Sequence, residues 1–202
     1  MKKSTKEKIF DTALDLFSQK GYSAVSIREI TRTIGIKESS LYNHYKNKEQ
    51  ILETILTHFR NDFSKTLPPM EALDQILANT TTETFLKAGH RNFKEYMENE
   101  NGQKMWRILQ VEQFREPLAR EIILRDFFGT VIDFLEIVFT KLIEMNRIKP
   151  IPPRLLATEY QYPVFSMLTE YNILKFDGKD VSQVEKRLDD HIEFFLTIIQ
   201  LP

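Results

Sequence analysis

The chain has 202 residues, 42% hydrophobic and 28% charged, with a formal net charge of −1, which is the composition of an ordinary globular protein with a sizeable core. It has no cysteine, which excludes disulfides, thiolate nucleophiles and cysteine-bound metals. The histidines are scattered, with no pair at i,i+4 spacing. We therefore expect no zinc site and no cofactor.

The charge is unevenly distributed along the chain. Residues 1–60 contain 11 Lys and Arg against 7 Asp and Glu, a net charge of +4, whereas the remaining residues carry a net charge of −5. A basic segment joined to an acidic body would keep any attraction for phosphates local. An excess of this size does not by itself identify a nucleic-acid binder.

The basic N-terminal segment is not followed by the apolar run of about 7–15 residues that a signal peptide needs. No uncharged stretch approaches the roughly 18 residues of a membrane span. We therefore expect a cytoplasmic protein that has no membrane contact.

The first predicted helix covers residues 4–20. Ser4 or Thr5 is its expected N-cap, and Gly21 follows its last residue, as is typical of a helix end. Its apolar stripe consists of Ile9, Phe10, Ala13, Leu14 and Phe17. This helix is expected to pack across the two short helices that follow it.

Residues 26–51 are predicted to contain two short helices joined by a tight turn. Ser26 is a good N-cap, with Glu29 three residues later as its capping-box partner. An apolar face at spacings of three and four is formed by Ile27, Ile30 and Ile34. Gly35 then suits a turn that needs positive φ.

The second short helix begins near Lys37 or Glu38, with Leu41 and Tyr45 one turn apart on one face. Small polar side chains surround them. This pattern is typical of a helix-turn-helix DNA-binding motif, although an ordinary helical hairpin on a protein surface has similar spacing.

The same segment resembles the N-terminal domain of the TetR family of bacterial transcriptional regulators. The signature Gly-Ile-x-x-x-Ser-Leu-Tyr-x-His-Tyr-x-x-Lys-Glu begins at Gly35, and the resemblance covers about the first quarter of the chain. Further matching residues are Ala13, Leu16, Phe17, Gly21, Tyr22, Ser26, Ile27, Ile30 and Ile51. Lys37 and Ser39 depart from the residues frequent in the family, so the resemblance gives no operator sequence.

The resemblance implies a DNA-reading surface on these two helices. Arg suits guanine and Asn suits adenine by bidentate geometry. The candidates for base contacts are Arg28, Lys37, Ser39, Ser40 and Asn43. The candidates for phosphate contacts are Ser26, Tyr42, His44 and Lys48. Tyr45 is expected in the core and Tyr42 outside it.

The remainder of the chain shows helical periodicity and no alternating strand pattern, so we predict an all-α fold. Further helices are expected at about 48–63, 71–78, 82–98, 103–115, 117–146, 153–176 and 181–200. Loops are expected at Asn99–Gly102 and at 149–153. We divide the chain into a helix-turn-helix DNA-binding domain, 1–48, and a larger helical effector-binding and dimerisation domain, 49–202.

The stretch 127–143 is apolar apart from a thin polar stripe, so its helix should be central to the body. The stripe includes Asp133 and Glu136. It is interpreted as a solvent-facing strip, the alternative being an acidic lining for a cationic ligand.

The two C-terminal helices carry apolar residues on more than one face. One stripe of the last helix consists of Val181, Val184, Leu188, Ile192, Phe195 and Ile199, whereas Phe194, Leu196 and Ile198 lie away from it. Such surface needs a partner. Helices near 153–176 and 181–200 resemble the pair that forms the dimer interface in TetR-like regulators. Pro163 should kink the first of them.

The resemblance also implies an effector pocket, whose apolar lining would suit an aromatic or amphipathic molecule. The candidate lining residues are Trp106, Leu109, Tyr162 and Phe165. The leading hypothesis is a ligand-responsive homodimeric regulator, a repressor of a palindromic operator. The alternative is a helical dimer that acts through protein partners and has a vestigial head. An enzyme with Glu95, His90 and Asp133 as acid–base groups ranks last, because no nucleophile, metal or phosphate-loop spacing supports it.

Overall fold

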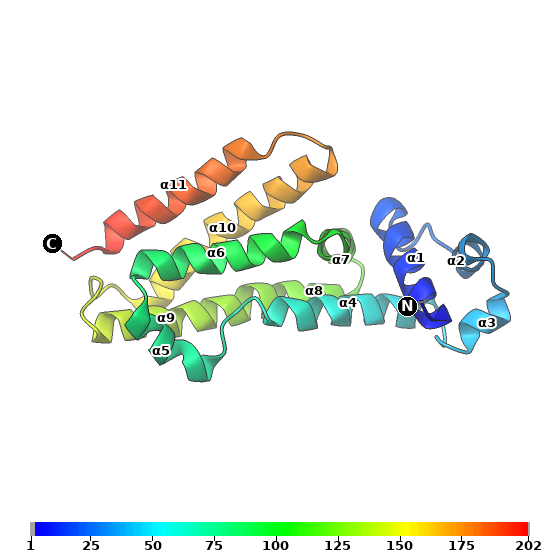
Figure 1. Cartoon of the computed structure of the whole chain (residues 1–202), viewed down its shortest axis with the longest axis horizontal. Helices are drawn as coiled ribbons and strands as arrows, with labels where there is room; N and C mark the ends of the chain where they lie inside the picture. Colours follow the sequence, from blue (N-terminus) through cyan, green and yellow to red (C-terminus); the bar gives the residue numbers. More distant parts are fainter. Residues whose placement is uncertain (1–2, 202) are drawn as a thin grey trace. The chain divides into compact units, whose positions relative to one another are not determined.

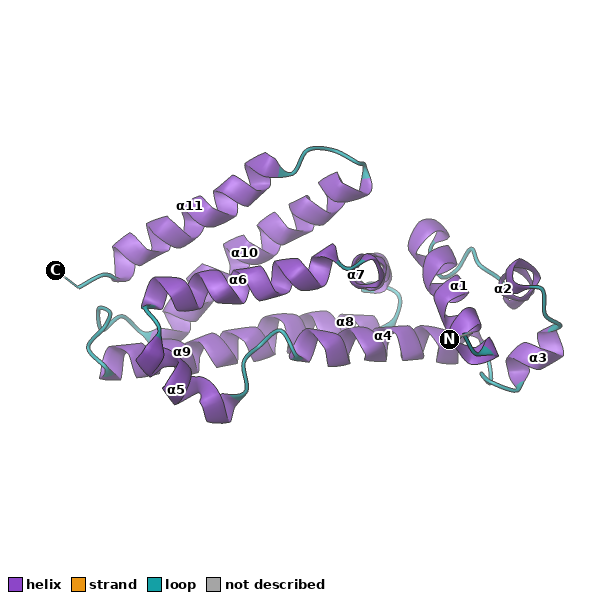
Figure 2. Ribbon diagram, viewed as in Figure 1, coloured by secondary structure: helices purple, strands orange, loops and turns teal. Residues whose placement is uncertain are grey.

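In the computed structural model, which describes residues 3–201, all regular secondary structure of the described residues is helical (Figure 2). The predicted all-α class is therefore confirmed. The helices pack into two compact units. The first contains the chain up to Ser64 together with Tyr96–Ile123, and the second contains Lys65–Glu95 together with the chain from Leu124. The division into functional domains 1–48 and 49–202 stays a prediction, because packing alone does not test it.

The first unit is built around helix α1 (Figure 1). Its complete helices are α1 (Thr5–Lys20), α2 (Ile27–Ile34), α3 (Glu38–Tyr42), α4 (Lys48–Ser64), α7 (Glu100–Glu112) and α8 (Pro117–Glu121). Helix α1 packs against α2, α4 and α7, and α4 packs against α7 and α8. The core side chains, each at most 2% exposed, include Ile9, Ala13, Leu14, Phe17, Ile30, Leu41, Ile51, Ile55, Phe59, Trp106 and Leu109.

The second unit is organised around α10, which packs against both α9 and α11 (Figure 1). Its elements are η1 (Met70–Ala72), α5 (Leu73–Asn79), α6 (Thr82–Glu98, to Glu95), η2 (Ile122–Thr130, from Leu124), α9 (Val131–Glu144), α10 (Pro153–Phe176) and α11 (Ser182–Ile199). An ion pair of 2.7 Å between Lys94 and Glu185 joins α6 to α11. The rings of Phe139, Tyr160 and Phe195 contact one another within this core.

The predicted loop at Asn99–Gly102 is wrong, because α7 begins at Glu100 and ends at Glu112 instead of covering 103–115. Only Asn99 interrupts the helices, and its side-chain oxygen caps α7 by accepting from the Asn101 N–H at 2.9 Å. Gly102 lies inside α7 and close to the backbone of Tyr96. A Cβ there would lie 2.5 Å from the backbone oxygen of Tyr96, so this close approach requires glycine.

The predicted single helix 117–146 is also wrong. Helix α8 ends at Glu121, η2 is a π-helix, and α9 ends at Glu144. Within η2 the Thr130 hydroxyl donates to the backbone oxygen of Arg125 at 3.1 Å, five residues earlier. An apolar run of this length can form either a π-helix or an α-helix. Its periodicity therefore does not predict which of the two forms.

The polar stripe of α9 pairs with an arginine of the next helix. The Arg154 guanidinium contacts the carboxylates of Asp133 and Glu136, and both Asp133 and Arg154 are exposed. This pairing favours the solvent-facing interpretation over an acidic ligand lining. Pro163 lies inside α10, as predicted.

His90 of α6 is expected to make the stability of the second unit depend on pH. Burial lowers the pKa of His90, whereas Asp189 and Glu185 oppose this shift and Lys94 adds to it. Its Nδ1 is buried with no hydrogen-bond partner among residues 3–201. The unfolded chain therefore binds more protons below about pH 6.5, and stability should fall as the pH drops from there towards the folded pKa. Urea unfolding at pH 7.5 and 5.5 should show a smaller loss for His90→Gln than for the wild type. An equal loss in both proteins would contradict this assignment.

Candidate nucleic-acid interface

Helix α2 begins and ends as its sequence predicts. The Ser26 hydroxyl accepts from the Glu29 N–H at 3.1 Å, and Gly35 adopts the left-handed conformation with φ 71°. The Glu29 carboxylate forms an ion pair with the Lys20 ammonium at 2.6 Å. This pair lowers the pKa of Glu29 and links the end of α1 to the first turn of α2.

Helix α3 is shorter than the pattern suggested, since it ends at Tyr42. The N–H groups of His44 and Tyr45 both donate to the Leu41 carbonyl oxygen, closing the last turn. Tyr45 is 3% exposed and lies in the core, whereas Tyr42 is 51% exposed, so the expected contrast between the two tyrosines is confirmed.

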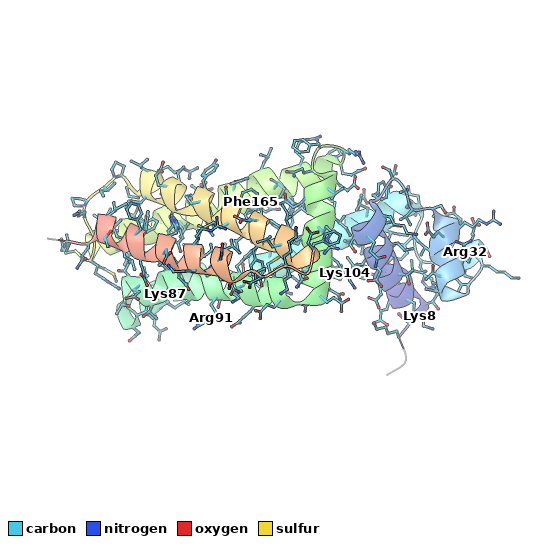
Figure 3. All side chains as sticks on the ribbon, turned by 90° about the horizontal axis from the view of Figure 1, so that it is seen from above. Lys8, Arg32, Lys87, Arg91, Lys104 and Phe165 are labelled. Carbon is cyan, nitrogen blue, oxygen red and sulfur yellow. The ribbon has the colours of Figure 1, made fainter. Side chains whose placement is uncertain are left out.

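The side chains predicted to touch DNA gather on the surface of α2, α3 and their flanks. Ser40 and Lys48 are half-buried, and the exposed members are Ser26, Arg28, Lys37, Ser39, Tyr42, Asn43 and His44. Two further exposed cations of this region, Arg32 and Lys46, were not predicted (Figure 3 labels Arg32). A count of the basic residues flanking the motif would have found both.

Lys48 is already held by the protein. Its ammonium donates to the backbone oxygens of Tyr22 at 3.0 Å and Val25 at 2.8 Å, and it lies 4.1 Å from the centre of the Tyr22 ring. Burial, reinforced by nearby glutamates, raises the pKa of Tyr22 to about 12, so its phenol stays neutral at physiological pH. Lys48 thus fixes the α1–α2 turn, and its predicted phosphate contact stays a prediction.

Three other hydrogen bonds shape this region and were not predicted. Asn47 caps α4 by accepting from the Gln50 N–H at 2.9 Å, and the Gln50 side-chain oxygen accepts from the Lys46 N–H at 2.7 Å. Glu112 of α7 accepts from the Tyr22 N–H at 3.0 Å. The two bonds of Gln50 have the local signature of a cap, whereas the bond of Glu112 joins residues 90 positions apart and has no sequence signal.

The four predicted ligand-lining residues fall in different units. Trp106 and Leu109 are at most 1% exposed in the core of the first unit. Tyr162 and Phe165 belong to the second unit, where both rings contact Phe128 at centroid distances of 5.1 and 4.5 Å (Figure 3 labels Phe165). Neither unit by itself brings the four residues together.

An open groove of about 600 Å³ lies elsewhere in the second unit. Its lining consists of Leu77, Ala78, Thr80, Thr81, Thr82, Met145 and Arg147. The Arg147 guanidinium donates to the backbone oxygens of Leu77 at 2.5 Å and Thr80 at 2.7 Å, which ties the α5–α6 connection to the end of α9. The groove is partly polar and contains none of the predicted ligand residues.

No group of His, Asp and Glu among the described residues is arranged to hold a metal ion. None of the helices within residues 3–201 is long and apolar enough to cross a membrane.

The short α2–α3 pair around a left-handed glycine, with α1 packed across it, is a helix-turn-helix, the architecture of a large class of DNA-binding domains. Residues 9–55 match the family described as "Bacterial regulatory proteins, tetR family". The matched segment contains most of α1, all of α2 and α3, and the start of α4.

Two relatives by sequence and one solved structure illustrate the similarity. The chain is 28% identical over 144 residues to the Bacillus subtilis "Probable HTH-type transcriptional regulator YttP", covering 71% of this chain and 65% of that protein. It is 43% identical over 58 residues to IcaR, a negative transcriptional regulator of the biofilm operon icaADBC in Staphylococcus epidermidis, covering 29% of this chain and 31% of IcaR. The aligned stretch therefore spans less than two thirds of either relative.

The fold is shared over nearly the whole chain with SmeT, the repressor of a multidrug efflux pump of Stenotrophomonas maltophilia, solved in complex with triclosan. The TM-score is 0.68 at 18% identity, covering 98% of this chain and 93% of SmeT. At this identity the likeness concerns the fold.

Proposed function

We propose that the chain is a homodimeric, ligand-responsive transcriptional regulator that represses by binding a palindromic operator. The observation that carries this proposal is the set of exposed donors and cations on α2, α3 and their flanks. Arg28 and Lys37 make no ion pair within residues 3–201, so their charges are available to DNA. IcaR is a negative regulator and SmeT is a repressor, and these roles support repression as the sign of regulation. Such a protein would act in the bacterial cytoplasm.

Direct readout would come from α3 and the side chains beside it. Ser39 of α3 and Asn43, which directly follows this helix, are exposed, and Arg28 lies on the neighbouring helix. Asn pairs with adenine and Arg with guanine in the major groove. Tyr42 and His44 would hold phosphates, which fix the register of the protein on DNA without reading sequence.

Dimerisation would use the outer faces of α10 and α11. The stripe Val184, Leu188, Ile192, Phe195 and Ile199 is at most 3% exposed and covers the core of the second unit. Apolar residues on the other faces of these helices stay exposed: Leu155, Tyr162, Ile173, Phe176, Phe194 and Ile198. A second copy of the chain would cover these residues and place two α3 helices roughly 34–36 Å apart, in successive major grooves.

The effector would be an aromatic or amphipathic molecule. In the second unit, Tyr162 and Phe165 contact the π-helix η2 through Phe128, and π-helical turns occur frequently at functional sites. Trp106 and Leu109 remain candidate lining residues of the first unit. Release from DNA would require the effector to bind more tightly to a state with wrongly spaced reading helices.

The test is binding to DNA from immediately upstream of the coding region, titrated across salt beside a scrambled duplex. The wild type should bind the upstream DNA more tightly and with a steep salt dependence. Arg28→Ala and Asn43→Ala should each weaken this binding by about 10-fold to 100-fold. Arg91→Ala is the matched control, because Arg91 is an exposed arginine of α6 (Figure 3) and should bind like the wild type. A ligand-free dimer without even weak, salt-sensitive binding would favour action through protein partners.

A further inference from the structure

Glu112 is an unusual residue for the core of a small helical unit. It is 1% exposed, and although Oε1 accepts from the Tyr22 N–H, its buried Oε2 has no hydrogen-bond partner among the described residues. A buried carboxylate that is incompletely satisfied destabilises the fold. Glu112 is also the last residue of α7, where its charge meets the negative end of the helix dipole. Stability alone therefore does not account for a glutamate here.

The contact of Glu112 is one half of a clamp on Tyr22. Glu112 approaches from α7 and receives the Tyr22 N–H at 3.0 Å, while Lys48 approaches from α4 and donates to the Tyr22 carbonyl oxygen at 3.0 Å. The Tyr22 ring contacts the Lys48 ammonium and also the Phe17 ring, which is nearly perpendicular to it at a centroid distance of 5.3 Å. Glu112 and Lys48, from two different helices, thus hold the backbone N–H and the carbonyl oxygen of Tyr22.

The clamp holds the turn that precedes α2. This turn, from Gly21 to Val25, has one weak internal backbone bond, from the Val25 N–H to the Tyr22 oxygen at 3.3 Å. The clamp also reaches Val25, whose backbone oxygen accepts from the Lys48 ammonium at 2.8 Å. Ser26, the N-cap of α2, follows directly.

We propose that Glu112 is a positioning residue for DNA reading: it holds the Gly21–Val25 turn, and through Ser26 the start of α2, in the orientation that presents Arg28 to DNA. The inference rests on the proposed DNA-binding function. It explains why a carboxylate with one unpaired oxygen is buried at this position, because the same residue would orient the proposed reading surface. A residue of this kind lowers stability and improves function.

Two variants of similar size separate this role from a structural one. Glu112→Gln keeps an oxygen acceptor for the Tyr22 N–H, whereas Glu112→Met removes it. The full-length Met variant should unfold near the wild-type temperature, because losing a carboxylate with one unpaired oxygen offsets the cost of leaving the Tyr22 N–H without an acceptor. Its Tyr22 amide should nevertheless exchange with solvent about 10-fold faster, and its operator Kd should rise about 10-fold. The Gln variant should restore both values to within about twofold of the wild type.

Lys104→Met is the control, because it removes a different polar contact between α7 and α1, the 2.6 Å ion pair of Lys104 with Asp15 (Figure 3 labels Lys104). Operator binding by this control should stay within about twofold of the wild type, since partly exposed ion pairs contribute little. The inference is overturned if the wild type binds the operator and Glu112→Met binds it equally well. It is also overturned if Glu112→Met lowers the unfolding temperature with unchanged Tyr22 exchange. A wild type that binds no operator overturns the proposed function itself.

Discussion

The double variant Ile173→Glu with Phe194→Glu should be monomeric and should bind the operator about 100-fold or more weakly than the wild type. Ile173 on α10 is 60% exposed and Phe194 on α11 is 64% exposed. Two like charges on an apolar face that pairs with its own copy would each be desolvated without a partner. A monomer loses the gain in affinity that comes from tethering two reading heads, while each head keeps its own contacts. Sedimentation equilibrium and operator titration measure the two effects.

Phe114→Glu is the matched control, since Phe114 is 83% exposed and lies outside α10 and α11. It should leave the oligomeric state unchanged, which separates the loss of one interface from a general effect of surface charge. A dimer that persists in the double variant, or an equal dissociation of the Phe114→Glu protein, would refute the proposed interface. A monomeric double variant that binds the operator as tightly as the wild type would refute cooperation between two heads.

Phe59→Ala should lower the free energy of unfolding by about 3–5 kcal/mol, the usual range for removing a buried phenylalanine. Phe59 of α4 is fully buried, and its ring lies 5.8 Å from that of Trp106 and 5.9 Å from those of Phe63 and Tyr96. Truncation would remove all three ring contacts and leave a cavity between α4 and α7 that the packed helices can close only in part. Urea denaturation monitored by tryptophan fluorescence measures the loss.

Two comparisons make the result specific. Phe59→Leu keeps most of the buried volume and should lose less than about 1.5 kcal/mol. Tyr42→Ala removes a half-exposed ring on the reading surface and should change stability by less than about 0.5 kcal/mol while weakening DNA binding. A loss below about 1 kcal/mol for Phe59→Ala would show that this cluster does not carry the stability of the first unit.

The local features of the helix-turn-helix were predicted from the sequence in most of their parts. Ser26, Gly35 and the alternation between Tyr42 and Tyr45 act through bonds and faces within a few residues of themselves, so their pattern carries the information. The same holds for α1, where Ser4 and Glu7 form a capping box of 3.2 and 2.7 Å contacts that lies wholly within one turn. The length of α3 was not predicted, because Tyr45 leaves the helix to enter the core.

The elements that the sequence misjudged lack a local signal. Gly102 lies inside α7, where the backbone of Tyr96 is so close that a Cβ would not fit. The π-helix η2 has the same apolar composition as the α-helix after it, so only the packed structure separates them. The four ligand candidates are aromatic or apolar residues of the body, yet Trp106 and Leu109 lie in one unit and Tyr162 and Phe165 in the other.

The sequence by itself therefore determined the all-α class, most helix bounds and the helix-turn-helix, because caps, glycine turns and helical periodicity are local. Only the tertiary structure decided that Lys48 and Glu112 meet at Tyr22, and that Arg147 holds Leu77 across 70 positions of chain. Such contacts join polar groups whose partners no local pattern specifies. Burial of the apolar faces of the helices drives the packing of the fold. This packing determines where each charged group lies, and therefore which polar groups it can contact.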